Sequence, residues 1–213
     1  MKTIYIVRHG ETPINKEKLI HGRTFKPDCT LSEKGFTQAE EFYEAHKDLN
    51  IQHIFTSSLL RSQLSVNKFL EKYPHTALKE FDEVDFGEAE GKTIFENGVC
   101  RLDPAFNEWA KGNYDAKMPR GQSMNEVIEE QKRGMEIVTN TPSDVLIASH
   151  RRAIVIFLSW TLQIPYNKAM SIEVRNLQMF RIGFEKSTNT FVDIDNIATQ
   201  CNTTNKNFNN IFN

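Results

Sequence analysis

The chain has 213 residues with a formal net charge of −2 at pH 7, and its isoelectric point is about 6.3. With 39% hydrophobic and 25% charged residues, its composition is that of a soluble globular domain, which excludes the disordered and membrane-spanning classes. The balanced charge provides no field that would attract nucleic acid or anionic lipid, so we expect neither a nucleic-acid nor a membrane partner.

The cysteines and the amino-terminal residues indicate the cellular compartment in which we expect the protein. Cys29, Cys100 and Cys201 are odd in number and far apart, which argues against a disulfide framework or a zinc module and is typical of a reducing environment. The first apolar run, residues 4–7, is too short for the core of a signal peptide. We therefore expect a cytoplasmic protein, present as a monomer or a homodimer.

The first predicted element is a buried strand at residues 4–7, because this run is apolar and β-prone without polar alternation. Arg8 and His9 follow it, and Gly10 allows the backbone to turn sharply. Open α/β sheets bind their ligands at this end of the strands. This stretch alone fits a solvated strand end as well as a binding site.

Further along the chain, strand and helix patterns alternate. Residues 11–30 are predicted to form a loop over the end of the first strand, and Ser32 is the expected N-cap of the helix that follows. The later predicted elements are a strand at 51–57, a helix from 60 to 70, a helix with Asp103 as N-cap, a helix opened by the capping box of Ser123 and Glu126, a strand at 144–149, a helix at 153–162, and a hairpin of 177–184 with 190–195.

This order predicts a three-layer α/β/α sandwich with a mostly parallel central sheet. We expect one domain over residues 1–200, in which the irregular segment 94–120 is an insertion. The asparagine-rich tail 201–213 has little core-forming material and is expected to be loosely held.

Basic side chains follow three of the predicted strands. Arg8 and His9 end the first, Arg61 lies in the helix after the second, and His150 ends the third. Because the carboxyl ends of parallel strands meet at one edge of a sheet, we expect these side chains to converge. Such a cluster repels itself unless an anion lies within it, and phosphate oxygens match guanidinium donors.

A histidine among arginines indicates chemistry as well as binding. A neutral imidazole at pH 7 can attack phosphorus and form a covalent intermediate that water resolves. The leaving alkoxide then needs a proton from a carboxyl group. The spacing leaves five candidates for this group, Asp82, Glu83, Asp85, Glu88 and Glu90.

The motif Val7-Arg8-His9-Gly10-Glu11-Thr12 resembles the signature of the histidine phosphatase superfamily, which has the phosphoglycerate-mutase-like fold. Further blocks occur in the family's order over residues 4 to 160, namely Leu31 to Gly35 with Gln38-Ala39, Thr56 to Ser62, Glu83 to Glu88 with Glu90-Gly91, Gly121 to Ser123, and Ser149-His150. Any one block is weak support for the resemblance, whereas all of them together, in the family's order, are strong support.

The resemblance implies that His9 accepts the phosphoryl group and that Glu83 donates the proton. Arg8, Arg61 and His150 complete the implied phosphate pocket, and Asn15 matches a position that usually contacts the transferred phosphate, with Thr12 and Gly22 on the same loop. We also count Arg151 as a candidate substrate-binding residue, because its long side chain follows His150. The resemblance further implies a small phosphorylated substrate, no metal, no organic cofactor, and a helical cap formed by residues 94–120.

Three residues depart from the family pattern. Gln122 stands where glutamate is common, Arg151 where glycine is usual, and Ala89 where an aromatic residue is usual, so that Ala89 is expected to open space beside Glu83. We predict a phosphomonoester phosphatase. A phosphoglycerate mutase is the alternative with the same chemistry, although segment 94–120 is shorter than the insertion of the mutases, and a phospholigand-binding protein without turnover is the non-enzymatic alternative.

Other motifs carry less weight. Gly87 to Thr93 resembles a P-loop but has one residue too few between its glycines. The four remaining histidines, His21, His46, His53 and His75, have no metal-ligand spacing and are predicted to be surface or packing residues.

Overall fold

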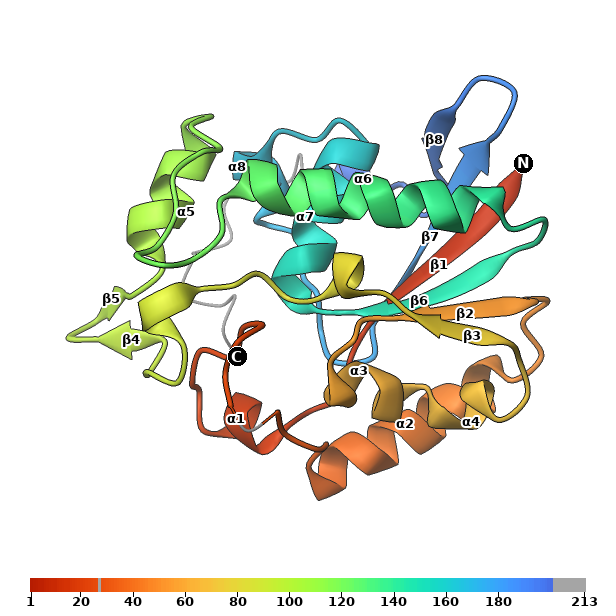
Figure 1. Cartoon of the computed structure of the whole chain (residues 1–213), viewed down its shortest axis with the longest axis horizontal. Helices are drawn as coiled ribbons and strands as arrows, with labels where there is room; N and C mark the ends of the chain where they lie inside the picture. Colours follow the sequence, from red (N-terminus) through yellow and green to blue (C-terminus); the bar gives the residue numbers. More distant parts are fainter. Residues whose placement is uncertain (27, 201–213) are drawn as a thin grey trace.

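The computed structural model describes residues 1–26 and 28–200 (Figure 1). Its centre is a six-stranded sheet with the strand order β3-β2-β6-β1-β7-β8. The strands are β1 (Lys2–Arg8), β2 (His53–Thr56), β3 (His75–Ala77), β6 (Val145–Ser149), β7 (Met179–Glu185) and β8 (Thr190–Asp193). The first four of these are mutually parallel, and β7 and β8 add an antiparallel edge.

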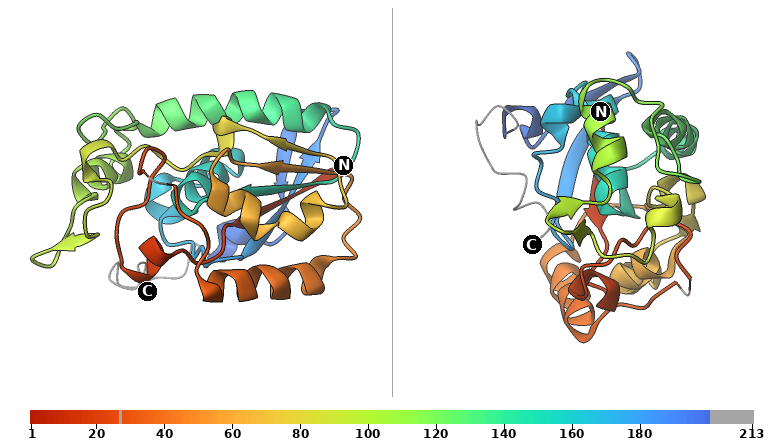
Figure 2. Two further views of the ribbon diagram at one scale, coloured as in Figure 1. Left: turned by 60° about the horizontal axis from the view of Figure 1, so that its bottom comes forward. Right: turned by 90° about the vertical axis from the view of Figure 1, so that its left-hand side faces the viewer.

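Helices cover both faces of the sheet (Figure 2). On one face lie α6 (Met124–Asn140) and α7 (Arg151–Thr161), and on the other lie α2 (Glu33–His46), α3 (Leu60–Ser65) and α4 (Asn67–Leu70). This arrangement confirms the predicted three-layer α/β/α fold with a mostly parallel sheet.

Strand alternation divides the core in two, because successive side chains of a strand point to opposite faces. On β6, Ile147 packs in the cluster with α6 and α7, while Leu146 and Ala148 pack in the cluster with α2 and α4. Both clusters are closed to solvent. The sheet is therefore held rigidly from both sides, and its strand ends are fixed supports for side chains.

Local sequence signals set the helix starts. Ser32 accepts a hydrogen bond from the Gly35 N–H at the start of α2, and Ser123 forms a reciprocal capping box with Glu126 at the start of α6, as predicted. Helix α7 begins at Arg151 rather than at residue 153, with His150 as its N-cap residue. Its first turn therefore starts directly at the end of β6.

The predicted helix over 60–70 is wrong in one respect, since it is broken at Val66 into α3 and α4. The Ser65 hydroxyl bonds back to the Arg61 carbonyl at 2.6 Å, a contact that bends helices. Val66 leaves helical geometry and buries its side chain against α2 and β2.

Asp103 is the first residue of α5 (Asp103–Ala110) and not its N-cap, which is Leu102 without a side-chain bond. Segment 94–120 holds α5 and the small sheet of β4 (Phe95–Glu96) and β5 (Val99–Cys100), which lie beyond the carboxyl ends of the parallel strands (Figure 1). The division into one domain with a cap stays a prediction.

Several short elements were not predicted from the sequence. They are the strands β3, β4 and β5, the helices α1 (Pro13–Lys16), α8 (Tyr166–Ala169) and α9 (Ile197–Gln200), and 3₁₀ turns at Lys79–Phe81 and Gly87–Ala89. Cys29 and Cys100 are free thiols, while Cys201 and the tail prediction lie outside the described residues. In the described ranges, no helix has both the length and the apolar character to cross a membrane.

Candidate active site

The structure brings together the basic residues that follow β1, β2 and β6. The His9 N–H donates to the Ser149 carbonyl at 3.0 Å, which ties the ends of β1 and β6 together. The rings of His9 and His150 lie 5.1 Å apart, and Arg61 Nε donates to His150 Nδ1 at 3.2 Å. The convergence predicted from parallel strand ends is therefore present.

His9 is buried and held in one tautomer. Its Nδ1 lies 2.7 Å from the Gly10 carbonyl, which can only accept, so Nδ1 carries the proton and Nε2 keeps a lone pair. Burial lowers the pKa of His9 well below its usual value, and the nearby charges of Arg61 and Arg8 lower it further. The imidazole is therefore neutral at pH 7 and available as a nucleophile.

Arg61 lies behind His9 and is 1% exposed. Nη1 donates to Asp28 Oδ1 at 3.0 Å and to His21 Nε2 at 3.1 Å, and Nη2 donates to the Gly22 carbonyl at 3.0 Å. With the bond from Nε to His150, four of the five N–H donors have partners among the described residues. These partners fix the position of the buried charge.

His150 is fully buried next to Arg61. Because Nδ1 accepts from Arg61, Nε2 is the protonated nitrogen and donates to the Ser57 hydroxyl at 2.7 Å. Burial, followed by the charge of Arg61, lowers its pKa well below the usual value. His150 is therefore a second neutral imidazole.

His21 belongs to this cluster, although it was predicted to be a surface or packing residue. It is buried, lines the same cavity as His9 and accepts from Arg61. Burial lowers its pKa to about 3. The signal that could have found it is its position directly before Gly22, in a loop that the family resemblance placed over the site.

Glu83 is the carboxyl group of the site. Its oxygens accept from the backbone N–H groups of Ala153 at 2.9 Å and Arg152 at 3.2 Å, in the first turn of α7, and from that of Val84 at 3.0 Å. These N–H groups hold the carboxyl group in a fixed orientation at the start of α7. Of the five candidate carboxyl groups, Glu83 alone lines the cavity that contains His9.

The other four acidic side chains have structural partners. Asp82 accepts from the Ser58 N–H and hydroxyl, Asp85 accepts from the Gly87 N–H, Glu88 lies near Arg120, and Glu90 accepts from the Phe86 N–H. Burial raises the pKa of Asp82 and of Glu90. These partners position the loop that carries Glu83.

The cavity next to His9 has a volume of about 90 Å³ and combines a basic side with an apolar side. The basic side is formed by Arg8, Arg151 and Arg152. The apolar side is formed by Leu19, Ile20, Phe86, Ile94, Leu102 and Phe106. Of these, Phe106 lies on α5 and Leu102 directly precedes that helix. Arg61 and His150 lie behind this cavity and do not line it.

The remaining predicted residues have different roles. Asn15 lines the cavity, while Thr12 is buried and caps α1 by accepting from the Asn15 N–H at 3.2 Å. Gly22 contributes its carbonyl to Arg61, and a Cβ there would lie 2.1 Å from Glu90 Oε1. Arg151 lines the cavity at the start of α7.

Two of the family departures lie away from His9. Gln122 accepts from the Asp85 N–H and donates to Glu130. Ala89 lines a separate cavity with Lys92 and Cys100, so the expectation that it opens space beside Glu83 is wrong. The physical reason is that Ala89 ends a 3₁₀ turn that faces β5 and not α7.

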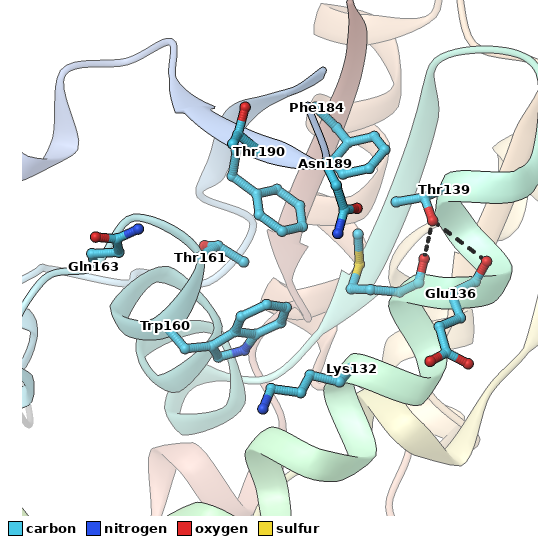
Figure 3. A pocket seen from close by; sticks show the side chains of 11 residues that line it. Lys132, Glu136, Thr139, Trp160, Thr161, Gln163, Phe184, Asn189 and Thr190 are labelled. Atoms are coloured by element: carbon cyan, nitrogen blue, oxygen red, sulfur yellow. Dashed lines mark hydrogen bonds between the residues drawn. The ribbon is translucent and has the colours of Figure 1, made fainter. Parts of the chain in front are cut away.

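A second cavity, of about 530 Å³, lies among α6, α7 and the β7–β8 hairpin (Figure 3). Trp160, Phe184 and Lys132 are among its lining residues. None of the converging basic residues lines it, so we assign the candidate active site to the smaller cavity at His9. In the described part of the chain, no cluster of three His, Cys, Asp or Glu side chains is arranged to hold a metal ion.

Comparison with known proteins places this geometry in context. A family model for the histidine phosphatase superfamily (branch 1) matches residues 4–197. A curated relative from Cronobacter sakazakii, named "Probable phosphoglycerate mutase GpmB", is 30% identical over 195 residues, which are 88% of this chain and 87% of that protein.

Solved structures of similar fold include two phosphatases. Phosphoserine phosphatase from Entamoeba histolytica in complex with 3-phosphoglyceric acid has a TM-score of 0.77 at 20% identity, covering 92% of this chain and 96% of that one. Alpha-ribazole phosphatase from Shigella flexneri has a TM-score of 0.72 at 18% identity, covering 89% and 93%. At these identities, the two structures indicate a common fold.

Proposed function

The chain belongs to the histidine phosphatase superfamily (branch 1), and on this premise we propose that it hydrolyses a small phosphomonoester through a phosphohistidine at His9. The observation that carries the proposal is the state of His9, a buried neutral imidazole with its Nε2 lone pair free for attack. Its cavity also contains Arg8 and the carboxyl group of Glu83. A nucleophile, a phosphate ligand and a proton donor thus share one small space.

In the first step, His9 Nε2 forms a bond to phosphorus while the bond from phosphorus to the ester oxygen breaks. The protonated carboxyl group of Glu83 gives its proton to the leaving oxygen, so that the product leaves as an alcohol. Arg8 on the cavity wall and Arg61 behind His9 stabilise the charge on the phosphoryl oxygens. A preorganised donor such as Arg8 contributes roughly 10²–10³ in rate, whereas Arg61, which does not line the cavity, acts through its charge.

In the second step, the Glu83 carboxylate takes a proton from a water molecule whose oxygen attacks phosphorus. The bond between phosphorus and His9 Nε2 breaks, inorganic phosphate leaves, and His9 returns to its neutral state. The N–H groups of Arg152 and Ala153 hold the Glu83 carboxyl group in place for both proton transfers.

The test is phosphate release from a panel of soluble phosphomonoesters, including p-nitrophenyl phosphate, by the wild type and by His9→Asn. The wild type should release phosphate, and the variant should not. His75→Asn, at an exposed position on β3, is the matched control and should keep full activity. Release by His9→Asn at the wild-type rate would exclude His9 as the nucleophile.

A phosphoglycerate mutase is the second candidate, and the similarity to the Cronobacter relative, a probable phosphoglycerate mutase, favours it. A mutase returns the phosphoryl group from histidine to substrate, whereas a phosphatase transfers it to water. Incubation with 3-phosphoglycerate separates the two, because the phosphatase gives free phosphate and the mutase gives 2-phosphoglycerate. A protein that binds phosphate but converts no ester would instead be a phospholigand-binding protein.

A further inference from the structure

Gln131 is a buried polar residue in the largely apolar interface between α6 and α7. It is 1% exposed, and its buried neighbours one turn before and after it on α6 are the apolar residues Val127 and Met135. An amide group buried among apolar side chains costs free energy unless both of its ends are hydrogen-bonded. The two partners of the Gln131 amide therefore define its role.

Both partners of Gln131 lie on α7. Its Nε2 donates to the Ala153 carbonyl at 2.8 Å, and its Oε1 accepts from Trp160 Nε1 at 2.9 Å. A carbonyl only accepts and an indole N–H only donates, so these partners fix the amide in one orientation. Ala153 lies in the first turn of α7, and Trp160 lies about two turns farther along. Gln131 thus joins α6 to the first turn of α7.

The first turn of α7 also holds Glu83. The Ala153 N–H donates to Glu83 Oε1 at 2.9 Å, and the Arg152 N–H donates to Glu83 Oε2 at 3.2 Å. His150, the N-cap residue of this helix, makes no side-chain capping bond within the described residues, so Glu83 takes the place of the cap. The position of the Glu83 carboxyl group therefore depends on the position of this turn.

Ala153 connects the two contacts, because its carbonyl accepts from Gln131 and its N–H donates to Glu83. We propose that Gln131 is a positioning residue for proton transfer by Glu83, which fixes the first turn of α7 and thereby orients the carboxyl group toward the leaving oxygen. The proposal rests on the phosphatase function proposed above and adds α6 to the parts of the fold that serve the acid. Among the described residues, none of α6 lines the His9 cavity, so Gln131 acts through α7 and does not touch the substrate.

Two aryl esters with the same ring separate the acid step from the other steps. The leaving oxygen of phenyl phosphate is more basic than that of p-nitrophenyl phosphate, so its departure depends more strongly on a proton from Glu83. The value of kcat/KM reports the steps up to the departure of the leaving group. The ratio of kcat/KM for p-nitrophenyl phosphate to kcat/KM for phenyl phosphate therefore measures how well Glu83 delivers its proton.

Gln131→Met nearly keeps the volume of the side chain and removes both hydrogen bonds. We expect the ratio to rise about 10-fold, because a displaced acid slows phenyl phosphate while p-nitrophenyl phosphate changes by less than about 2-fold. Gln131→Glu keeps the acceptor for Trp160 but, when ionised, has no donor for the Ala153 carbonyl, so it should raise the ratio as well. Met135→Leu, one turn farther along α6 and also buried, is the matched control and should keep the wild-type ratio.

A double-mutant cycle tests whether Gln131 acts through Glu83. In the Glu83→Gln variant the side chain at position 83 has no acidic proton to give, so adding Gln131→Met should not change the ratio further. A rise of the same size in both backgrounds shows that Gln131 acts by another route and overturns the proposal. Thermal melts establish that each variant is folded at the assay temperature, and Gln131→Glu decides the question if Gln131→Met is not.

The possible results separate this inference from the proposed function. If the wild type hydrolyses both esters and neither variant at position 131 changes the ratio, Gln131 does not position Glu83, and the phosphatase function stands. Equal losses for both esters leave the ratio unchanged, so they show that Gln131 supports only the fold. Hydrolysis of neither ester by the wild type overturns the proposed function itself.

Discussion

Asp28 gives the sharpest test of how Arg61 is held. Its Oδ1 lies 3.0 Å from Arg61 Nη1, and its Oδ2 accepts the Leu60 N–H at 2.6 Å, at the first residue of α3. In the described part of the chain, Asp28 is the one carboxylate within ion-pair distance of Arg61. The change Asp28→Asn keeps the shape of the side chain and removes its charge.

The structure sets the size of the expected effect. A hydrogen bond to a charged group contributes about 1.5–3 kcal/mol, and asparagine can still accept one of the two bonds through its amide oxygen. The side chain of Asp28 is 20% exposed, which adds some screening. We expect a loss of about 2 kcal/mol in the free energy of unfolding. We also expect a fall of about 10–100-fold in kcat for p-nitrophenyl phosphate, because Arg61 loses its fixed orientation.

Urea denaturation measures the first effect and steady-state kinetics the second. Glu40→Gln, which removes an exposed ion-pair partner of Lys68, is the matched control and should change neither quantity measurably. If Asp28→Asn matches Glu40→Gln in both assays, Asp28 does not position Arg61 and the reasoning is refuted.

Three other predictions concern the acid, the buried imidazoles and the loop that carries Gly22. Glu83→Gln should lower kcat for alkyl phosphates by about 10²–10⁴ while largely sparing p-nitrophenyl phosphate, whose leaving group needs little protonation; equal losses on both would count against Glu83 as the acid. Burial and then Arg61 lower the pKa of His21 to about 3, so the unfolded chain binds the extra proton below pH 6.5, and the stability from this group is present above pH 6.5 and lost as pH falls. His21→Gln should therefore reduce the slope of unfolding free energy against pH between pH 4 and 6 by about 1.4 kcal/mol per pH unit, and an unchanged slope would contradict the buried neutral state. Gly22→Ala should destabilise the fold by about 1–3 kcal/mol in urea denaturation, because a Cβ would lie 2.1 Å from Glu90 Oε1 and 2.7 Å from the Val84 carbonyl. Gly98→Asn meets open space and tests only the cost of a side chain at φ +79°, so it should destabilise less than Gly22→Ala, and equal effects of the two changes would show that the contacts at Gly22 do not matter.

The sequence was sufficient for the parts of the site that follow regular strands. Arg8 is the last residue of β1, and His9 and His150 directly follow β1 and β6, so the parallel pairing of these strands brings all three to one edge. The capping signals at Ser32 and Ser123 likewise act within one turn of chain and were predicted correctly. Local patterns of this kind need no knowledge of distant contacts.

Features that depend on distant contacts were not predictable. His21 is in the site because Arg61, on a different element, donates to it. The break at Val66 depends on Ser65, whose hydroxyl bonds back to Arg61 and also accepts the Gly10 N–H from the loop after β1. The choice of Glu83 among five acidic side chains was open to spacing alone, because only the docking of this loop on α7 separates them.

Arg152 is another residue whose side-chain surroundings could not be predicted from the sequence. In the sequence it is one of two arginines after a histidine, and neither periodicity nor charge distinguishes them. The structure separates Arg152 by its contacts with Phe106 and Tyr166, which come from α5 and α8. The sequence identifies the residue as arginine, but it does not predict that Phe106 and Tyr166 surround its guanidinium.

The central claim, that His9 carries the phosphoryl group, is tested most directly by trapping the intermediate. Wild-type protein mixed with p-nitrophenyl phosphate is quenched with base within milliseconds, digested, and examined by mass spectrometry for a phosphorylated peptide. The account predicts an acid-labile, base-stable phosphate on the peptide that contains His9, formed and lost at rates compatible with turnover. Phosphate on another residue, or turnover with no phosphorylated peptide at any time, would contradict it.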